Sequence, residues 1–144
     1  MNIFTYGSLI FPEVLDALTE RYFEHEDITV PGFERRTLIG KPYPGVIRND
    51  GTSVEGRLWF DLDRDSVEIL DRFEDTDYER RSIEIETRTR GRVNASMYII
   101  PDSLKQTLSD EPWDKEHFMR EHLAEYVSMC RAFRNEVSQH FRAR

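Results

Sequence analysis

Apolar and polar side chains alternate with a period of two in three segments of this chain, residues 54–60, 83–85 and 93–99. Successive side chains of a β-strand point to opposite faces of the sheet, so this pattern predicts half-buried strands. Gly91 lies between the last two segments and is placed to turn a hairpin. Residues 3–6, 28–39 and 43–48 are also predicted as strands. The chain must therefore build a sheet.

Helical signals interrupt these strands at three places. Pro12 stands where the first position of a helix tolerates proline. Asp65-Ser66-Val67-Glu68 resembles a capping box that opens a second helix ending near Glu74. From Asp114 onward apolar residues recur near helical spacing, which predicts a long C-terminal helix over residues 113–141. The combined pattern predicts an α+β fold, a compact antiparallel or mixed β-barrel flanked by helices.

Length and composition limit the classes of protein that fit. The 144 residues predict a single domain, 1–144, and 12% aromatic with 33% charged residues is typical of a globular chain. A net charge of −8 argues against nucleic-acid binding, which requires cations to neutralise phosphates. The single Cys130 excludes an intramolecular disulfide and suits a reducing compartment. Because no apolar run has membrane-spanning length and no signal peptide is evident, we expect a cytoplasmic protein without a membrane partner.

The first candidate site follows the first predicted strand, where Tyr6-Gly7-Ser8-Leu9 forms a glycine-containing turn. Backbone N–H groups in such a turn can hold an anion without any cationic side chain. The segment can equally be an ordinary connection between a strand and a helix. On the residues alone both interpretations stay open.

The second candidate is Glu74, one of six acidic residues between positions 68 and 79. A charge run of this kind usually forms a solvated face, and the stretch lacks the central glycine of a calcium-binding EF-hand loop. What distinguishes Glu74 is Phe73 before it and the predicted end of a helix. A carboxyl in an apolar pocket has a raised pKa, which suits a general base.

Other reactive side chains carry weaker signals. Tyr98 and Tyr6 are expected near the pocket as hydrogen-bond donors, although a strand tyrosine most often packs in the core. Arg80 is expected to pair with a nearby acid, and Cys130 is expected to be a small buried hydrophobe. The histidines show no metal-ligand spacing, and the chain has no dinucleotide fingerprint or phosphate loop. We therefore expect neither a metal nor a cofactor.

Several motifs in fixed order resemble those of the γ-glutamyl cyclotransferase-like superfamily, in particular its branch named for plant avirulence-induced proteins. The resemblance covers most of the chain and rests on these segments: Tyr6-Gly7-Ser8-Leu9, Phe11-Pro12, Pro31-Gly32-Phe33, Tyr43-Pro44-Gly45, Val54-Glu55-Gly56-Arg57-Leu58, Leu70-Asp71-Arg72-Phe73-Glu74 with Tyr78-Glu79-Arg80, and the tail Trp113–Phe133. The resemblance also implies a β-barrel flanked by helices.

The resemblance implies a reaction and assigns residues to it. A γ-glutamyl compound would close onto its own γ-carbonyl and release 5-oxoproline and a free amine or amino acid. Glu74 would be the general acid/base, and Tyr6, Gly7, Ser8, Leu9 and Tyr98 would bind the substrate. One alternative is a non-catalytic module with the same pocket, which binds a small carboxylate or acts as a regulatory partner. Another is a lyase or transferase acting on a related amide. The protein is expected to be a monomer or a homodimer.

Overall fold

The computed structural model describes residues 1–142, with side chains described as far as Gln139. Five strands and four α-helices lie within these residues, with short 3₁₀ turns between them. In chain order the main elements are β1 (Ile3–Thr5), α1 (Pro12–Thr19), β2 (His25–Thr37), β3 (Pro44–Trp59), α2 (Arg64–Glu74), β4 (Glu79–Glu86), β5 (Arg92–Ile99), α3 (Lys115–Glu121) and α4 (Leu123–Arg142). The 3₁₀ turns are η1 (Ser8–Ile10), η2 (Asp75–Asp77) and η3 (Asp102–Thr107).

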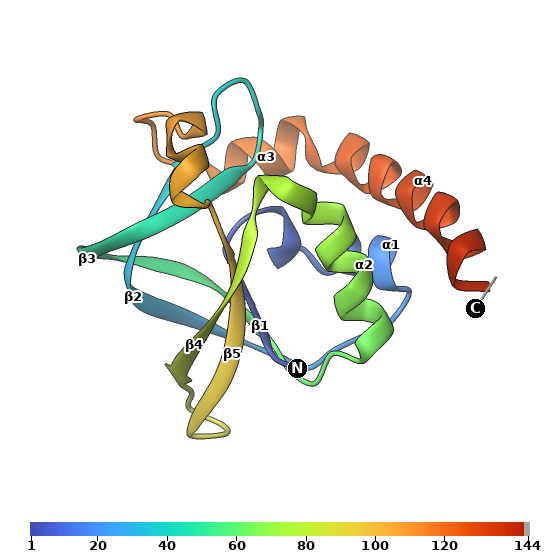
Figure 1. The fold of residues 1–144 in the computed structure, drawn as a ribbon, viewed down its shortest axis with the longest axis horizontal. Helices are drawn as coiled ribbons and strands as arrows, with labels where there is room; N and C mark the ends of the chain where they lie inside the picture. Colours follow the sequence, from blue (N-terminus) through green and yellow to red (C-terminus); the bar gives the residue numbers. More distant parts are fainter. Residues whose placement is uncertain (143–144) are drawn as a thin grey trace.

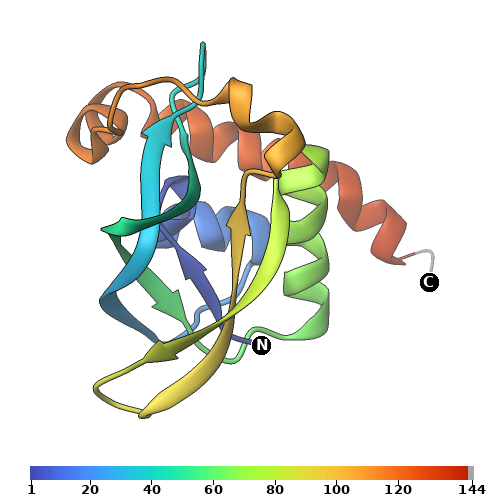
Figure 2. The ribbon, with the colours of Figure 1, turned by 60° about the vertical axis from the view of Figure 1, so that its left-hand side comes forward.

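The strands form one mixed sheet in the order β2-β3-β1-β5-β4. The central strand β1 pairs antiparallel with β3 and parallel with β5. The sheet curls strongly around its inner face, while α1 and α2 lie beside it and α4 runs across one end (Figures 1 and 2). The predicted α+β class is confirmed. The barrel is incomplete, because the edge strands β2 and β4 do not pair with each other.

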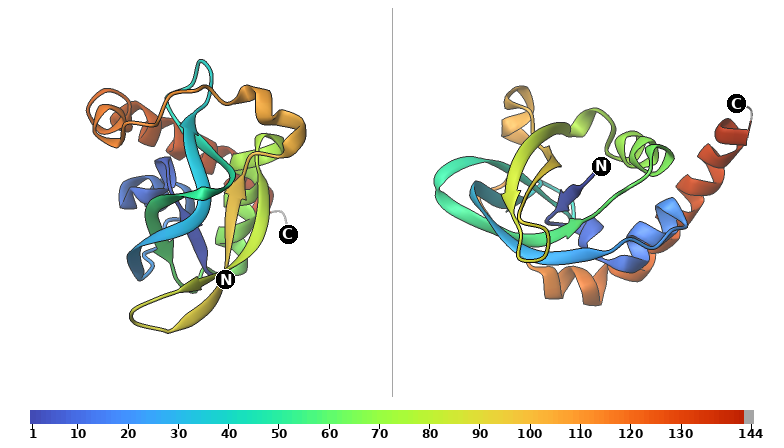
Figure 3. Two further views of the ribbon diagram at one scale, coloured as in Figure 1. Left: turned by 90° about the vertical axis from the view of Figure 1, so that its left-hand side faces the viewer. Right: turned by 90° about the horizontal axis from the view of Figure 1, so that it is seen from below.

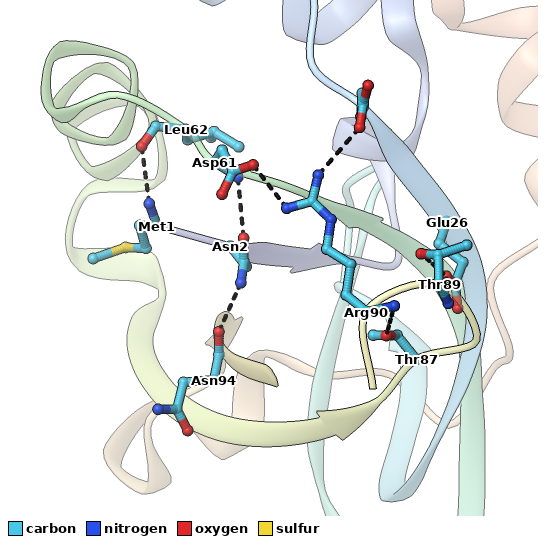
Figure 4. A network of polar contacts seen from close by, with 10 residues as sticks. Met1, Asn2, Glu26, Asp61, Leu62, Thr87, Thr89, Arg90 and Asn94 are labelled. Atoms are coloured by element: carbon cyan, nitrogen blue, oxygen red, sulfur yellow. Dashed lines mark hydrogen bonds and ion pairs between the residues drawn. The ribbon is translucent and has the colours of Figure 1, made fainter. Parts of the chain in front are cut away.

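Side chains rather than a ladder hold the two edges together at one end (Figure 4). Glu26 of β2 is buried, and its carboxylate accepts the N–H groups of Arg88 (2.8 Å) and Thr89 (3.2 Å) in the β4–β5 turn. The Thr89 hydroxyl donates to the same carboxylate at 2.7 Å. Arg90 of this turn also binds Asp61, beyond the end of β3, at 2.7 Å. Gly91 lies in the β4–β5 turn with a φ of +66°, which agrees with its predicted place in a hairpin turn. The contacts of Glu26 and Arg90 fix this turn to the opposite edge of the sheet.

Each face of the sheet has its own apolar core, as the period-two pattern requires. Ile3 and Tyr98 belong to the cluster between the sheet and the helices. Their neighbours Phe4 and Met97 belong to the cluster inside the curl of the sheet. Seen from below in Figure 3, the sheet curls and the helices lie outside the curl. The alternation therefore lets β1 and β5 contribute to both cores.

Two predicted strands join into one. Residues 43–48 and 54–60 were expected as separate strands, whereas β3 runs without interruption from Pro44 to Trp59. Pairing with β2 nevertheless shifts between them, because Pro31 faces Ser53 and Phe33 faces Arg48. The extra residues of β3 at this point interrupt the regular pairing of the hairpin.

The helix boundaries correct two predictions. Helix α2 ends at Glu74 as expected, but its N-cap is Asp63 and not Asp65. The Asp63 carboxylate accepts the backbone N–H of Ser66 at 3.2 Å and the Ser66 hydroxyl at 2.6 Å. Asp65 lies within the first turn instead, where its charge is favourable toward the helix dipole.

The expected single helix over 113–141 is two helices, α3 and α4, separated at His122. Helix α4 packs against α1, where Arg134 donates to the carbonyl of Leu18 (3.0 Å) and pairs with Glu20 (3.1 Å). Residues 143–144, the end of the predicted domain, lie outside the described residues. None of the helices in the described part of the chain combines the length and apolar composition needed to cross a bilayer.

Candidate active site

The loop after β1, residues 6–10, is held by its carbonyl groups. Those of residues 6, 7, 9 and 10 each accept a hydrogen bond: Tyr6 from Arg35 Nη1 (2.7 Å), Gly7 from the N–H of Ile10 (3.1 Å), Leu9 from Trp59 Nε1 (3.1 Å) and Ile10 from Arg57 Nη1 (3.2 Å). Three donors are side chains of β2 and β3, so the sheet fixes the orientation of these peptide groups. A backbone held in this way needs little reorganisation to bind a ligand.

Two N–H groups of the same loop have no hydrogen-bond partner of this kind. Those of Ser8 and Leu9 open the 3₁₀ turn η1, so the turn itself contains no acceptor for them. No other acceptor contacts them among the described residues. At Gly7 a Cβ would lie 2.8 Å from the ring carbons of Pro44, so glycine is required by close approach rather than by a positive φ. These features agree with an anion-binding turn.

Glu74, the last residue of α2, faces the same pocket as this loop. The side chain is half-buried, and no described group donates a hydrogen bond to its carboxyl. Burial, followed by the negative charge of Asp77, raises the pKa of Glu74 from 4.5 to about 8. Burial first, and then the Glu74 charge, raises the pKa of Tyr6. For Tyr98, burial and the contact with Asp71 come before the Glu74 charge as causes of its raised pKa. A carboxyl with this pKa exchanges protons near neutral pH and is suited to general acid/base chemistry.

The pocket has a volume of about 730 Å³, which is in the range of small-molecule sites. The loop after β1 and the segment 40–44 form one side, and the end of α2 and the helix α4 form the other. Aromatic side chains from the segment 40–44, from α2 and from α4 contribute to its lining: Tyr43, Phe73, Tyr126 and Phe133. The four predicted loop residues 6–9, Glu74 and Tyr98 all line this pocket.

Three pocket tyrosines use their hydroxyl protons within the protein. Tyr6 donates to the carbonyl of Tyr98 at 2.6 Å, and Tyr98 donates to Asp71 at 2.6 Å. Tyr78 donates to the carbonyl of Pro44 at 2.8 Å. Tyr6 and Tyr98 therefore lie where the sequence places them, but their rings shape the pocket and their protons are committed elsewhere.

The acidic stretch separates into distinct environments. Asp71 accepts hydrogen bonds from Nε (2.9 Å) and Nη2 (3.2 Å) of Arg80, which pairs with a nearby acid as expected. Glu68 pairs with Arg72 on the surface of α2, at 3.2 Å. Asp75, directly after the helix, is exposed, whereas the Glu74 carboxyl is the one with the strongly raised pKa.

Several site residues carry no clear sequence signal. Arg35 sits in β2 among other charged residues, yet it holds the loop carbonyl of Tyr6 and lies 5.4 Å from the centre of the Trp113 ring. Trp113 in turn donates to the carbonyl of Pro42 at 2.8 Å. Tyr126 appears in the sequence only as part of a helical repeat, but its hydroxyl accepts a hydrogen bond from Ser8 at 2.9 Å.

Two further expectations concern reactive groups. Cys130 is buried, and burial followed by the Glu74 charge raises the pKa of its thiol to about 12, so it packs as a neutral apolar side chain. Across the described residues, no three His, Cys, Asp or Glu side chains are grouped as metal ligands would be.

Comparison with known proteins identifies the family. The family described as gamma-glutamyl cyclotransferase, AIG2-like, matches residues 3–115. The chain belongs to this family. AIG2-like protein D of Arabidopsis thaliana is 26% identical over 95% of this chain and 91% of its own length. AIG2-like protein C of the same plant is 29% identical over 92% of this chain and 77% of its length. The predicted family and branch are confirmed.

Solved structures show the same fold. A solution structure of an Arabidopsis thaliana protein superposes with a TM-score of 0.66 at 26% identity, covering 89% of this chain and 86% of that one. A structure named gamma-glutamyl cyclotransferase gives a TM-score of 0.57 at 13% identity, covering 92% of this chain and 86% of that one. At 13% identity the second likeness supports the architecture alone.

Proposed function

We propose that this protein is a γ-glutamyl cyclotransferase-type enzyme that converts a γ-glutamyl compound into 5-oxoproline and a free amine or amino acid. The family membership supports the general activity, and the pocket supports the particular chemistry. The proposal rests mainly on one observation: Glu74, with a pKa raised to about 8, shares one pocket with the N–H groups of Ser8 and Leu9, which contact no acceptor among the described residues.

The nucleophile of this reaction belongs to the substrate. The neutral α-amine attacks the γ-carbonyl carbon, and the new C–N bond closes a five-membered ring. The attacking nitrogen gives up a proton to the Glu74 carboxylate. The same proton passes to the leaving nitrogen as the original amide C–N bond breaks, so Glu74 returns to its carboxylate form. Folding the substrate into the cyclic conformation supplies several kcal/mol of the barrier.

The pKa of Glu74 suits this proton transfer. A free α-amino group has a pKa of about 8, close to the value of about 8 of the Glu74 carboxyl. The carboxylate of Glu74 and the neutral form of the amine are therefore both accessible near neutral pH, and general acid/base catalysis is most effective when the pKa of the catalytic group lies near the operating pH. The N–H groups of Ser8 and Leu9 would bind either the α-carboxylate or the developing oxyanion.

A screen for 5-oxoproline release tests the proposal. γ-Glutamyl amino acids, γ-glutamylamines and glutathione are incubated with the wild type, with Glu74→Gln and with Asp75→Asn. We expect release by the wild type and by Asp75→Asn, and a loss of about 10²–10⁴ in kcat for Glu74→Gln. Equal turnover by Glu74→Gln would show that another group is the base. No release from any compound would favour the alternative of a binding module.

A further inference from the structure

Tyr126 of α4 occupies a fixed position in the wall of the pocket. Only 8% of the residue is exposed. Its ring meets the rings of Phe73, Phe118 and Tyr43 at centroid distances of 6.0, 5.4 and 6.0 Å. Phe73 immediately precedes Glu74, so these contacts relate the position of Tyr126 to that of the proposed base. A ring packed on several sides cannot move its hydroxyl without disturbing the core.

The hydroxyl of Tyr126 differs from those of the neighbouring tyrosines. The hydroxyl groups of Tyr6, Tyr78 and Tyr98 each donate a hydrogen bond to an acceptor within the protein. Tyr126 instead accepts a hydrogen bond from the Ser8 hydroxyl at 2.9 Å, and no carbonyl or carboxylate among the described residues accepts the proton of Tyr126. A buried hydroxyl normally donates a hydrogen bond. A hydroxyl in a pocket wall whose proton is not donated to the protein therefore indicates that a ligand supplies the acceptor.

The contact with Ser8 also places this donor beside the loop. Ser8 contributes one of the N–H groups that lack an acceptor, and its side chain holds the Tyr126 oxygen 2.9 Å from its own Oγ. Tyr43 also lines the pocket, but no group of the loop holds its hydroxyl. Tyr126 is therefore the pocket tyrosine whose donor is fixed next to the N–H groups of the loop.

On the basis of the proposed function, we propose that Tyr126 is a further catalytic residue that donates a hydrogen bond to the γ-carbonyl oxygen of the substrate. When the amine attacks, that oxygen becomes negatively charged, and the Tyr126 hydroxyl with the loop N–H groups stabilises it. Tyr126 donates a hydrogen bond without losing its proton. Burial raises the pKa of Tyr126 well above its ordinary value, so the hydroxyl stays protonated. Ser8 acts through Tyr126 as a positioning residue.

This assignment does not follow from the family match. The matched segment covers residues 3–115 and ends before α4 begins at Leu123. The proposed role of Tyr126 rests on three observations in this chain: the contact with Ser8, the aromatic packing of the ring, and a hydroxyl that donates to no carbonyl or carboxylate among the described residues.

The test measures turnover and product binding in parallel for the wild type, Tyr126→Phe, Ser8→Ala, the double variant and Tyr22→Phe. Tyr22 is 81% exposed and serves as the control for loss of a tyrosine hydroxyl. Loss of an oxyanion donor lowers kcat by about 10²–10³, and we expect this for Tyr126→Phe, with a much smaller change in KM than in kcat. Ser8→Ala should reduce kcat less, and the double variant should be no worse than Tyr126→Phe alone. Urea unfolding shows whether each variant remains folded.

5-Oxoproline separates this proposal from the proposed function, because its lactam carbonyl is the former γ-carbonyl. By calorimetric titration, loss of one neutral hydrogen bond weakens binding by about 2- to 10-fold, and we expect this for Tyr126→Phe. Turnover by the wild type with unchanged kcat in folded Tyr126→Phe would overturn the role of Tyr126 alone. Equal 5-oxoproline affinities would overturn it even without turnover. A wild type that neither releases nor binds 5-oxoproline would overturn both proposals.

Discussion

Replacing Glu74 by glutamine should stabilise the protein, and the gain should grow with pH. The pKa of Glu74 is about 8 in the folded protein and 4.5 as its ordinary value. Because the folded value is raised, the protonated carboxyl favours folding. Its full stabilising effect is present below pH 4.5 and is lost as the pH rises toward 8. Glutamine resembles the protonated acid and does not ionise, so the variant keeps that stability at every pH.

The magnitude follows from the two pKa values. Each pH unit above the ordinary value removes about 1.4 kcal/mol of relative stability until the folded pKa is reached. This relation gives an upper bound of about 3 kcal/mol at pH 7. Glu74 is half-buried at an open pocket, and its exposed part is screened by water. We therefore expect a gain of about 1–3 kcal/mol at pH 7 and almost none at pH 4.5.

Urea unfolding of wild type, Glu74→Gln and Asp75→Asn at pH 4.5, 7 and 8.5 measures this gain. Asp75 is the exposed carboxylate next in the chain, and its φ of +52° is a conformation that asparagine tolerates well. Its substitution removes one acidic charge outside the pocket and should give only a small difference in the free energy of unfolding. The reasoning is refuted if the difference between Glu74→Gln and wild type does not change with pH, or if Glu74→Gln is less stable than wild type at pH 8.5.

Other consequences of the structure are open to direct measurement. With a substrate identified, kcat/KM should rise with pH around a midpoint near 8, because Glu74 and the substrate amine both titrate there. A midpoint near 4.5 would contradict the raised pKa of Glu74. Gly7→Val should abolish 5-oxoproline binding, because a Cβ would lie 2.8 Å from Pro44, whereas Gly51→Ala meets only an ordinary contact at 3.7 Å; equal affinities would contradict the close approach. Hydrogen bonds from the β4–β5 turn lower the pKa of Glu26, so Glu26→Gln should lower the melting temperature at neutral pH and lose this effect in acid; a difference that persists in acid would contradict this account.

The sequence predicted most elements because local patterns determine them. Alternation located the strands, and the Phe73–Glu74 pair marked the end of α2. The α2 cap was misplaced because Asp63 and Asp65 are both suitable N-caps, and only the contact with Ser66 distinguishes them. The break at His122 contains neither proline nor glycine, so no local signal indicates where α3 gives way to α4.

The site was predictable only in part, for a different reason. Gly7 and Glu74 each lie in a short run of residues that a motif describes, so the sequence alone selected them as candidates. The contributions of Arg35 and Tyr126 depend on which partner the fold brings close, Tyr6 in one case and Ser8 in the other. These pairs are 29 and 118 residues apart in the chain. Local patterns do not encode the direction of a hydroxyl proton. They therefore could not predict that the hydroxyl groups of Tyr6 and Tyr98 donate to acceptors within the protein.

The physical organisation of the pocket explains why its two halves come from different parts of the fold. The loop needs fixed peptide groups, and β2 and β3 provide them through Arg35, Arg57 and Trp59, which bind its carbonyls. The proposed base needs an environment that disfavours its charge, and the end of α2 provides one by placing Glu74 beside aromatic side chains. A stabilised carboxylate would have a lower pKa and would be a weaker base. A pocket that hydrogen-bonded Glu74 fully would thus gain stability and lose the property on which the proposed reaction depends.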